Sequence, residues 1–149
     1  MKRFFLVVPV LLTVFAVAAS GPVLAGATEH KVAIHVDEND TARMNMALNN
    51  AMNINKYYKA KGEKVEIEVV AYGPGLNMFV EGKSPVEQRI ATMGLEMSNL
   101  SFSACGNTHR NMSAKAGKDI QLVSEASLVP SGVVRLMELQ EQGWSYIRP

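Results

Sequence analysis

The chain has 149 residues, which suits one domain of ordinary size and is short for two. Hydrophobic residues make up 48% and charged residues 19%, with 15 basic against 14 acidic side chains. This composition is globular, and a single cysteine excludes a disulfide-stapled miniprotein. It also excludes a disordered chain, a collagen-like repeat and a coiled coil. The near-neutral charge argues against a nucleic-acid partner, which would need a basic surface.

The first 25 residues have the features of a secretory signal peptide. Lys2 and Arg3 form a basic region, and an almost wholly apolar run follows over 4–19. The segment 23–25 fits the small-x-small rule for signal peptidase, and 25–27 offers a second cut. An uncleaved anchor is the alternative, but the run is shorter than the about 20 residues that a membrane-spanning helix needs. We therefore expect a periplasmic or secreted protein without membrane contact, folded as one domain over 28–149.

Strand-like and helical segments alternate along the rest of the chain. Apolar runs rich in β-branched residues, bounded by polar or glycine turns, predict strands, and apolar residues at helical spacing predict helices. Strands are predicted at 31–36, 65–72, 100–104, within 120–129, and at 144–147. Helices are predicted at 41–61, 84–97, 107–116 and 133–142, with Asp40 or Thr41, Ser84 and Ser131 as N-caps, and Glu87 closing a capping box with Ser84.

This alternation predicts a three-layer α/β/α fold, because parallel strands need helical crossovers that then cover both faces of the sheet. Such a sheet would have five parallel strands and look flavodoxin-like. Ligands of these folds bind beyond the carboxyl ends of the strands. The residues that we expect there form the candidate binding set, and Cys105 lies among them. The set is His35, Tyr72, Gly73, Gly106, Asn107, His109 and Ser131.

Cys105 is the candidate catalytic residue. It stands at the end of a predicted strand, directly before a predicted helix. Free N–H groups and the dipole at a helix start favour a thiolate, so we expect a lowered thiol pKa. His109 follows one helical turn later and could approach the thiol. The alternatives are a buried, structural cysteine and a surface histidine.

Two other patterns have simpler explanations. Met44 and Met46 could suggest a soft-metal site, but most methionines fall on apolar helix faces, so core filling is favoured. Asn45, Asn49 and Asn53 form a row at helical spacing, which is either a solvated face or a polar subunit contact. We expect no metal and no cofactor.

Four segments, 31–37, 71–75, 103–108 and 129–136, resemble the DsrE/DsrF-like family, and most closely its exported, poorly characterised branch. The resemblance implies a compact five-stranded α/β domain assembled as a homo- or hetero-oligomer. Its sulfur-relay members carry a persulfide on a cysteine at the end of the third strand, the place of Cys105. The start of the last helix at Ser131 also matches. The relay members are cytoplasmic, whereas this chain has an export signal.

Two functions follow as hypotheses. The leading one is an exported sulfur carrier that holds a persulfide on Cys105, with a small sulfur anion or a donor or acceptor protein as partner. The alternative is a non-enzymatic, homo-oligomeric module that binds a small ligand and has a structural cysteine. A methionine- and histidine-based metal protein is a third and weaker reading.

Overall fold

The computed structural model describes residues 29–149, so the predicted signal peptide at 1–25 lies outside the described residues. Strands and helices alternate along the described chain, as the sequence predicts. In chain order the elements are β1 (Glu29–Val36), α1 (Thr41–Lys61), β2 (Lys64–Ala71), the 3₁₀ helix η1 (Gly73–Phe79), α2 (Glu87–Glu96), β3 (Leu100–Cys105), α3 (Gly106–Ala116), β4 (Ala126–Val129), α4 (Gly132–Glu141) and β5 (Ser145–Ile147).

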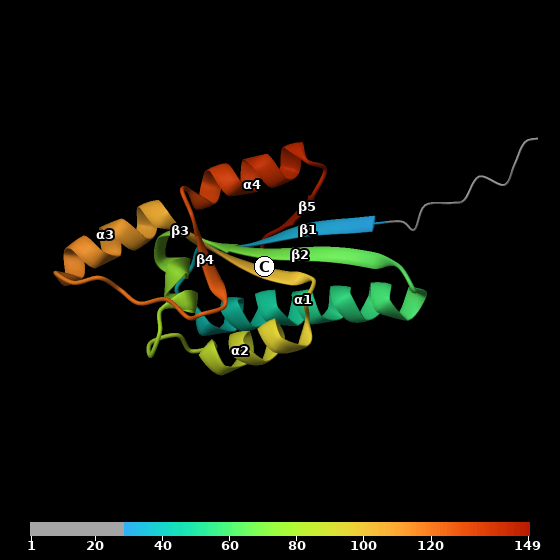
Figure 1. Cartoon of the computed structure of the whole chain (residues 1–149), viewed down its shortest axis with the longest axis horizontal. Coiled ribbons are helices and arrows are strands. Elements are labelled where there is room, and N and C mark those ends of the chain that lie inside the picture. Colours follow the sequence, from blue (N-terminus) through green and yellow to red (C-terminus); the bar gives the residue numbers. More distant parts are fainter. Residues whose placement is uncertain (1–28) are drawn as a thin grey trace, which may run out of the picture.

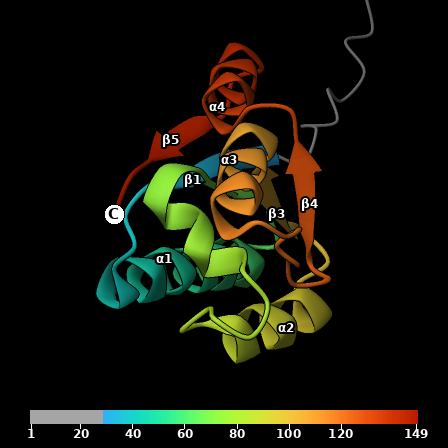
Figure 2. The ribbon, with the colours of Figure 1, turned by 90° about the vertical axis from the view of Figure 1, so that its left-hand side faces the viewer.

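The five strands form one parallel sheet in the order β4-β3-β2-β1-β5. Helices α1 and α2 cover one face and α4 covers the other, while α3 projects beyond the carboxyl ends of the strands (Figures 1 and 2). The predicted three-layer parallel fold is therefore confirmed. No helix within residues 29–149 is both long and apolar enough to cross a membrane.

The two faces of the sheet differ in character. The face under α1 and α2 holds the larger apolar core, which includes Met44 and Ile90. The face under α4 has a small cluster around Leu136 and Leu139. It also carries Glu68, which is 2% exposed. The α4 face is therefore the one that holds buried polar chemistry.

The helix starts agree with the sequence in one case and differ in two. Asp40 caps α1 as predicted, since its side chain accepts a hydrogen bond from the Arg43 N–H at 2.7 Å. The predicted capping box before α2 is wrong: Glu87 accepts from the Gly82 N–H, while the Ser84 hydroxyl donates to the Met78 carbonyl of η1 and accepts from the Val86 N–H at 3.2 Å. Ser131 occupies the N-cap position of α4, but its side chain makes no capping bond. The Ser84 and Glu87 side chains thus hold the segment that leads into α2, and α2 starts only at Glu87.

The fourth strand lies within the predicted range 120–129 and is short, because only Ala126–Val129 pairs with β3. The preceding residues bond instead to the segment that follows η1. Val80 and Leu122 form an isolated antiparallel bridge, and the Val123 N–H donates to the Phe79 carbonyl at 2.9 Å. These bonds use the backbone groups that a longer β4 would need.

The asparagine row on α1 binds a neighbouring helix. Arg89 of α2 donates to the side-chain oxygens of Asn45 and of Asn49, the latter at 2.9 Å. Asn53, further along the row, is exposed. Two members of the row therefore join α1 to α2 within the chain, a role that neither of the two expectations included, and a subunit contact there stays a prediction.

Candidate functional site

Cys105 stands where two helices begin. It is the last residue of β3 and the N-cap of α3, with extended backbone angles of φ −67° and ψ 114°. β4 lies beside it, with Val129 in register, and the chain then turns through 130–131 into α4. A Cβ placed on Gly132 would be 3.2 Å from the Cys105 Cβ, so the start of α4 comes against the cysteine.

Four N–H or O–H groups lie near enough to the sulfur to affect its pKa. Burial is the largest single influence on the thiol and raises its pKa, since only 4% of the residue is exposed. Hydrogen bonds from the Thr108 side chain and from the backbone N–H groups of Gly132, Thr108 and Asn107 act in the opposite direction. Together they outweigh burial, and the net pKa of Cys105 is lowered. Donors from both helix starts thus stabilise a thiolate in a nearly closed position.

Thr108 links the thiol to a third element of the fold. Its hydroxyl oxygen accepts a hydrogen bond from the Gly73 N–H, at the start of η1, at 2.9 Å. With its proton the same hydroxyl can bond to the sulfur of Cys105. Gly73 has a positive φ of 53°, a conformation that glycine adopts without steric cost. The turn after β2 therefore orients the hydroxyl that lowers the thiol pKa.

An aromatic cluster lies on the same face of the sheet. His35 Nδ1 and the Tyr146 hydroxyl are 2.7 Å apart, and the His35 ring stacks on Tyr72 with centroids separated by 4.5 Å. Burial, with His35 4% exposed, is the main cause of its lowered pKa, so the imidazole is neutral at neutral pH. Its Nε2 atom has no hydrogen-bond partner among the described residues. Tyr72 connects this cluster to the thiol, since a Cβ on Gly132 would also lie 3.0 Å from the Tyr72 Cβ.

Comparison with known proteins fits this arrangement. A model of the DsrE/DsrF-like family matches residues 30–149. The chain belongs to the DsrE/DsrF-like family. A similar solved structure is protein MTH1491 of Methanobacterium thermoautotrophicum, a protein of unknown function. It is 32% identical, covers 80% of this chain and 99% of its own, and superposes with a TM-score of 0.65. The curated proteins contain no match to the chain.

Several predicted site residues do gather around the thiol of this DsrE/DsrF-like protein. Asn107 contributes its backbone N–H, while its side-chain oxygen accepts a hydrogen bond from Arg110. Gly106 lets the start of α3 pack closely, because a Cβ there would be 3.0 Å from the Val129 carbonyl oxygen. Tyr72 and Gly73 approach the site from the turn after β2, and His35 lies behind Tyr72.

His109 and Ser131 do not take the roles expected of them. His109 Nε2 bonds to the Ile120 carbonyl oxygen at 2.7 Å and lies 3.7 Å from the Asp119 carboxylate. Its ring thus ties α3 to the loop that follows, and the geometry gives it no part in thiol activation. Ser131 contributes its backbone carbonyl, which accepts the Arg135 N–H, in place of a side-chain contact.

Three important side chains were absent from the predicted set. Thr108 could have been found, because it is the third residue after the cysteine and lies in the first turn of α3. Tyr146 lies in β5, which gave no functional signal. Glu68 interrupts an apolar strand, which marks it as a buried charge in need of a partner. No group of three or more His, Cys, Asp or Glu in the described part of the chain is placed to hold a metal.

A groove lies on the outer side of Thr108. It has a volume of about 340 Å³ and runs between η1 and α3. Its lining includes Thr108, the cationic side chain of Lys115 and the amides of Asn77 and Asn111. This lining suits an anion, although Cys105 itself does not line the groove.

Replacing Thr108 by valine is expected to raise the pKa of the Cys105 thiol, because the thiolate loses a hydroxyl donor while shape is kept. Loss of a hydrogen bond to a charged group of this kind should lower the fraction of thiolate about tenfold at any pH below the pKa. The chain has one cysteine, so the ultraviolet absorbance of the thiolate measures this pKa directly. Thr108→Ser keeps the hydroxyl and is the matched control. Equal titration curves for the valine and serine variants would contradict the assigned role.

Proposed function

We propose that this DsrE/DsrF-like protein is an exported sulfur carrier that holds a persulfide on Cys105. The observation that carries the proposal is the position of a single thiol where the starts of two helices meet, with N–H groups and the Thr108 hydroxyl that lower its pKa. These donors favour the thiolate, which is the attacking form. The same N–H groups suit the negative charge of a persulfide.

The reaction is a transfer between sulfur atoms. The Cys105 thiolate attacks the outer sulfur of a thiosulfate anion, a sulfur–sulfur bond forms at the cysteine, and the bond to the sulfonate sulfur breaks as sulfite leaves with the electron pair. The thiolate of an acceptor then attacks the outer sulfur of the persulfide and Cys105 departs as a thiolate. Charge and electrons balance in both steps without an external oxidant.

Burial of the thiol restricts the donor. Cys105 is 4% exposed, with Tyr72 and the start of α4 close against it. A small sulfur anion needs less displacement of these groups than a protein thiol does. We therefore favour a small anionic donor, and the groove beside Thr108, with Lys115, offers an attractive charge near the site.

The test is mass spectrometry of the intact protein after incubation with thiosulfate or polysulfide. We expect the wild-type chain to gain the mass of one sulfur atom, the gain to disappear on treatment with a reducing thiol, and Cys105→Ser to gain nothing. Expression of the full chain in an exporting host lets the same spectrum show whether residues 1–25 remain. A wild-type protein that never takes up sulfur, with a thiol pKa at the ordinary value, would refute the proposal.

A second function is favoured by the same burial. If Tyr72 and Gly132 close the thiol permanently, Cys105 is structural and the site binds a small ligand without covalent chemistry. In that case Cys105→Ala keeps the fold, and the wild-type thiol resists small alkylating reagents until the protein unfolds. Rapid alkylation of the folded protein at neutral pH would favour the carrier.

A further inference from the structure

The groove beside Thr108 follows one face of α3. Its lining residues from this helix are spaced by three and four positions, so they share one side of the helix. They are Thr108, Asn111, Met112 and Lys115. The other wall is formed by η1, which lies beside α3 at the carboxyl ends of the strands (Figure 2). Because Thr108 lines the groove and its hydroxyl also lowers the pKa of the Cys105 thiol, the groove runs from the neighbourhood of the thiol along α3.

The far end of this groove carries an uncompensated positive charge. Lys115 follows Thr108 by seven residues, which at a rise of about 1.5 Å per residue places their Cα atoms about 10 Å apart along the helix axis. Lys115 is exposed and forms no ion pair with any residue from 29 to 149. None of the described residues that line the groove is acidic. An anionic group is therefore expected at this end of the groove.

The dimensions of the groove favour an organic ligand over an inorganic one. Its volume of about 340 Å³ falls within the range of about 300–1,000 Å³ of pockets that bind small organic molecules. A thiosulfate ion would fill a small part of this volume, and with its outer sulfur at the thiol it is too short to reach Lys115. Between the two ends, the amides of Asn77 and Asn111 offer hydrogen bonds, and Pro74 and Met112 offer apolar surface. The middle of the groove therefore suits the body of a longer molecule.

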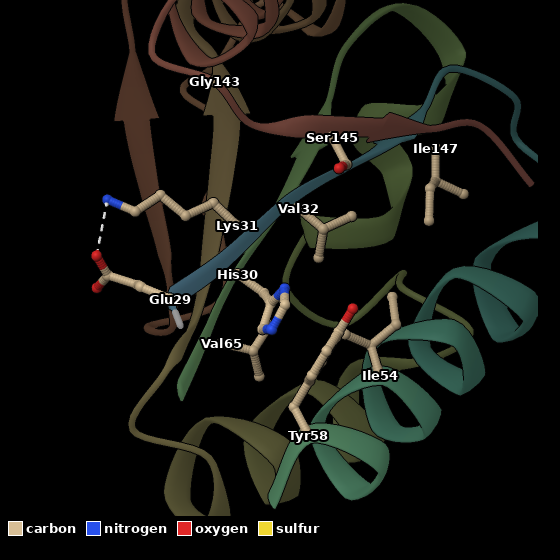
Figure 3. Close-up of a pocket in the computed structure, with 10 residues that line it drawn as sticks. All are labelled: Glu29, His30, Lys31, Val32, Ile54, Tyr58, Val65, Gly143, Ser145 and Ile147. Atoms are coloured by element: carbon tan, nitrogen blue, oxygen red, sulfur yellow. Dashed lines mark ion pairs between the residues drawn. The ribbon is translucent and has the colours of Figure 1, made fainter. Parts of the chain in front are cut away.

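A cavity of similar volume at the other end of β1 has a different character. It measures about 330 Å³, and the stacked rings of His30 and Tyr58 stand in its wall (Figure 3). Its lining holds charges of both signs, and the Lys31 ammonium lies 3.6 Å from the Glu29 carboxylate. This cavity also lies at the amino ends of the parallel strands, whereas the thiol lies at their carboxyl ends. The groove along α3 is therefore the one of the two that combines an unpaired cation with a place beside the thiol.

We propose that this groove binds a small organic persulfide that carries a carboxylate several bonds away from its sulfur atoms, and this assignment of the donor rests on the proposed sulfur-carrier function. The carboxylate pairs with Lys115, the body of the molecule lies along α3, and the persulfide end points past Thr108 to the thiol. A threonine in a helix has two accessible χ1 rotamers, so rotation of Thr108 lets the sulfur end reach Cys105. Thiosulfate is then a donor that reacts at the thiol without using the groove.

The transfer step balances without a further reactant. The Cys105 thiolate attacks the outer sulfur of the protonated persulfide, and a sulfur–sulfur bond forms at the cysteine. The bond between the two sulfur atoms of the donor breaks, and the electron pair leaves with the inner sulfur as an organic thiolate. The proton stays on the outer sulfur, so one anion and one neutral group are present before and after the step.

Binding is tested separately from sulfur transfer, by titration calorimetry on Cys105→Ser protein obtained by expressing the full chain. The probe is S-methylglutathione, which has carboxylates and amides but no sulfur to transfer. We expect saturable binding, and about five- to tenfold weaker binding when Lys115→Glu is added, because attraction of the carboxylate becomes repulsion. Adding Lys118→Glu instead is the matched control, since Lys118 is exposed just beyond the end of α3 and does not line the groove. The diethyl ester of the probe, which lacks the carboxylate charges, should bind both lysine variants equally.

Transfer is tested by the intact mass of the chain with Cys105 present, after incubation with glutathione persulfide or with thiosulfate at physiological ionic strength. Lys115→Glu should slow sulfur uptake from glutathione persulfide by about the factor found for binding. Uptake from thiosulfate should change little, because the Debye length of about 8 Å screens a charge that lies about 10 Å along α3 from Thr108. Lys118→Glu should take up sulfur from both donors as the wild type does.

Two results would overturn the assignment of the groove. They are no binding of S-methylglutathione, and equal binding by the Lys115→Glu and Lys118→Glu proteins. Failure of the carrier function gives a different result, because a chain that takes up sulfur from neither donor is not a carrier, and the assignment of the donor then fails with it even if the probe binds. A chain that takes up sulfur from thiosulfate, but binds the probe without dependence on Lys115, keeps the carrier function and loses the groove as the donor site.

Discussion

Replacing Arg135 by alanine is expected to lower the free energy of unfolding by about 3–5 kcal/mol, because it leaves a buried carboxylate without its counter-charge. Arg135 of α4 donates two hydrogen bonds to Glu68, at 2.8 and 2.7 Å, and the Ser103 hydroxyl donates a third at 2.6 Å. Glu68 is 2% exposed, so its carboxylate depends on these protein donors for its hydrogen bonds. A loss of this size is a large part of the about 5–15 kcal/mol that stabilises a typical domain.

The matched control for this prediction is Glu138→Ala. Glu138 is the other carboxylate near Arg135, at 4.0 Å, but its side chain is 52% exposed, and such pairs contribute little. Chemical denaturation of both variants measures the difference. The double change Glu68→Leu/Arg135→Leu should recover much of the lost stability, since buried ion pairs can be replaced by apolar groups, although Ser103 then loses its acceptor. An Arg135→Ala protein as stable as Glu138→Ala would show that Glu68 is not dependent on this ion pair.

The fold could be predicted because its strands and helices alternate and each strand is marked by local composition. The exceptions are contacts made over distance. β4 is short because backbone groups near Leu122 bond to the segment after η1, about forty residues earlier in the chain, and no local pattern reports this. Ser84 and Glu87 have the residue types of a capping box, yet Ser84 donates to the Met78 carbonyl of η1 and Glu87 accepts from the Gly82 N–H. Residue type indicates which bonds are available, and tertiary packing decides which are made.

The features of the candidate site likewise fall into those that local sequence indicates and those that tertiary contacts decide. The place of Cys105 follows from local sequence, because a strand end joined directly to a helix start sets its backbone. His109 was selected by its spacing from the cysteine, but the rotation of α3 directs its ring to Ile120. The position of Thr108 in the first turn of α3 is visible in the sequence, but the bond from the Gly73 N–H, 35 residues away, that orients its hydroxyl is not. The N–H of Gly132 reaches the thiol only because β4 pairs beside β3.

The turn after β2, which orients Thr108, also depends on Gly75, two residues after Gly73. Replacing Gly75 by alanine is expected to cost roughly 3 kcal/mol or more of unfolding free energy, because extra volume is forced into a tightly packed contact. The new Cβ would meet the Val36 carbonyl oxygen, and it would lie 2.6 Å from the Val36 carbonyl carbon and 2.8 Å from the Asp37 Cα. These are backbone atoms at the end of β1, so they cannot rotate away as a side chain could.

Relief of that contact requires η1 to move away from β1, and this links the stability of the turn to the chemistry of the thiol. The Gly73 N–H that holds Thr108 belongs to η1, so its displacement should also raise the thiol pKa. Gly94→Ala in α2 is the control: its Cβ would lie 2.9 Å from the flexible Glu125 side chain, and alanine favours helix, so stability should be unchanged or slightly higher. Thermal unfolding and thiolate absorbance measure the two effects. A Gly75→Ala protein that is destabilised with an unchanged thiol pKa would show that Thr108 is oriented by α3 alone, and an undiminished stability would refute the close contact itself.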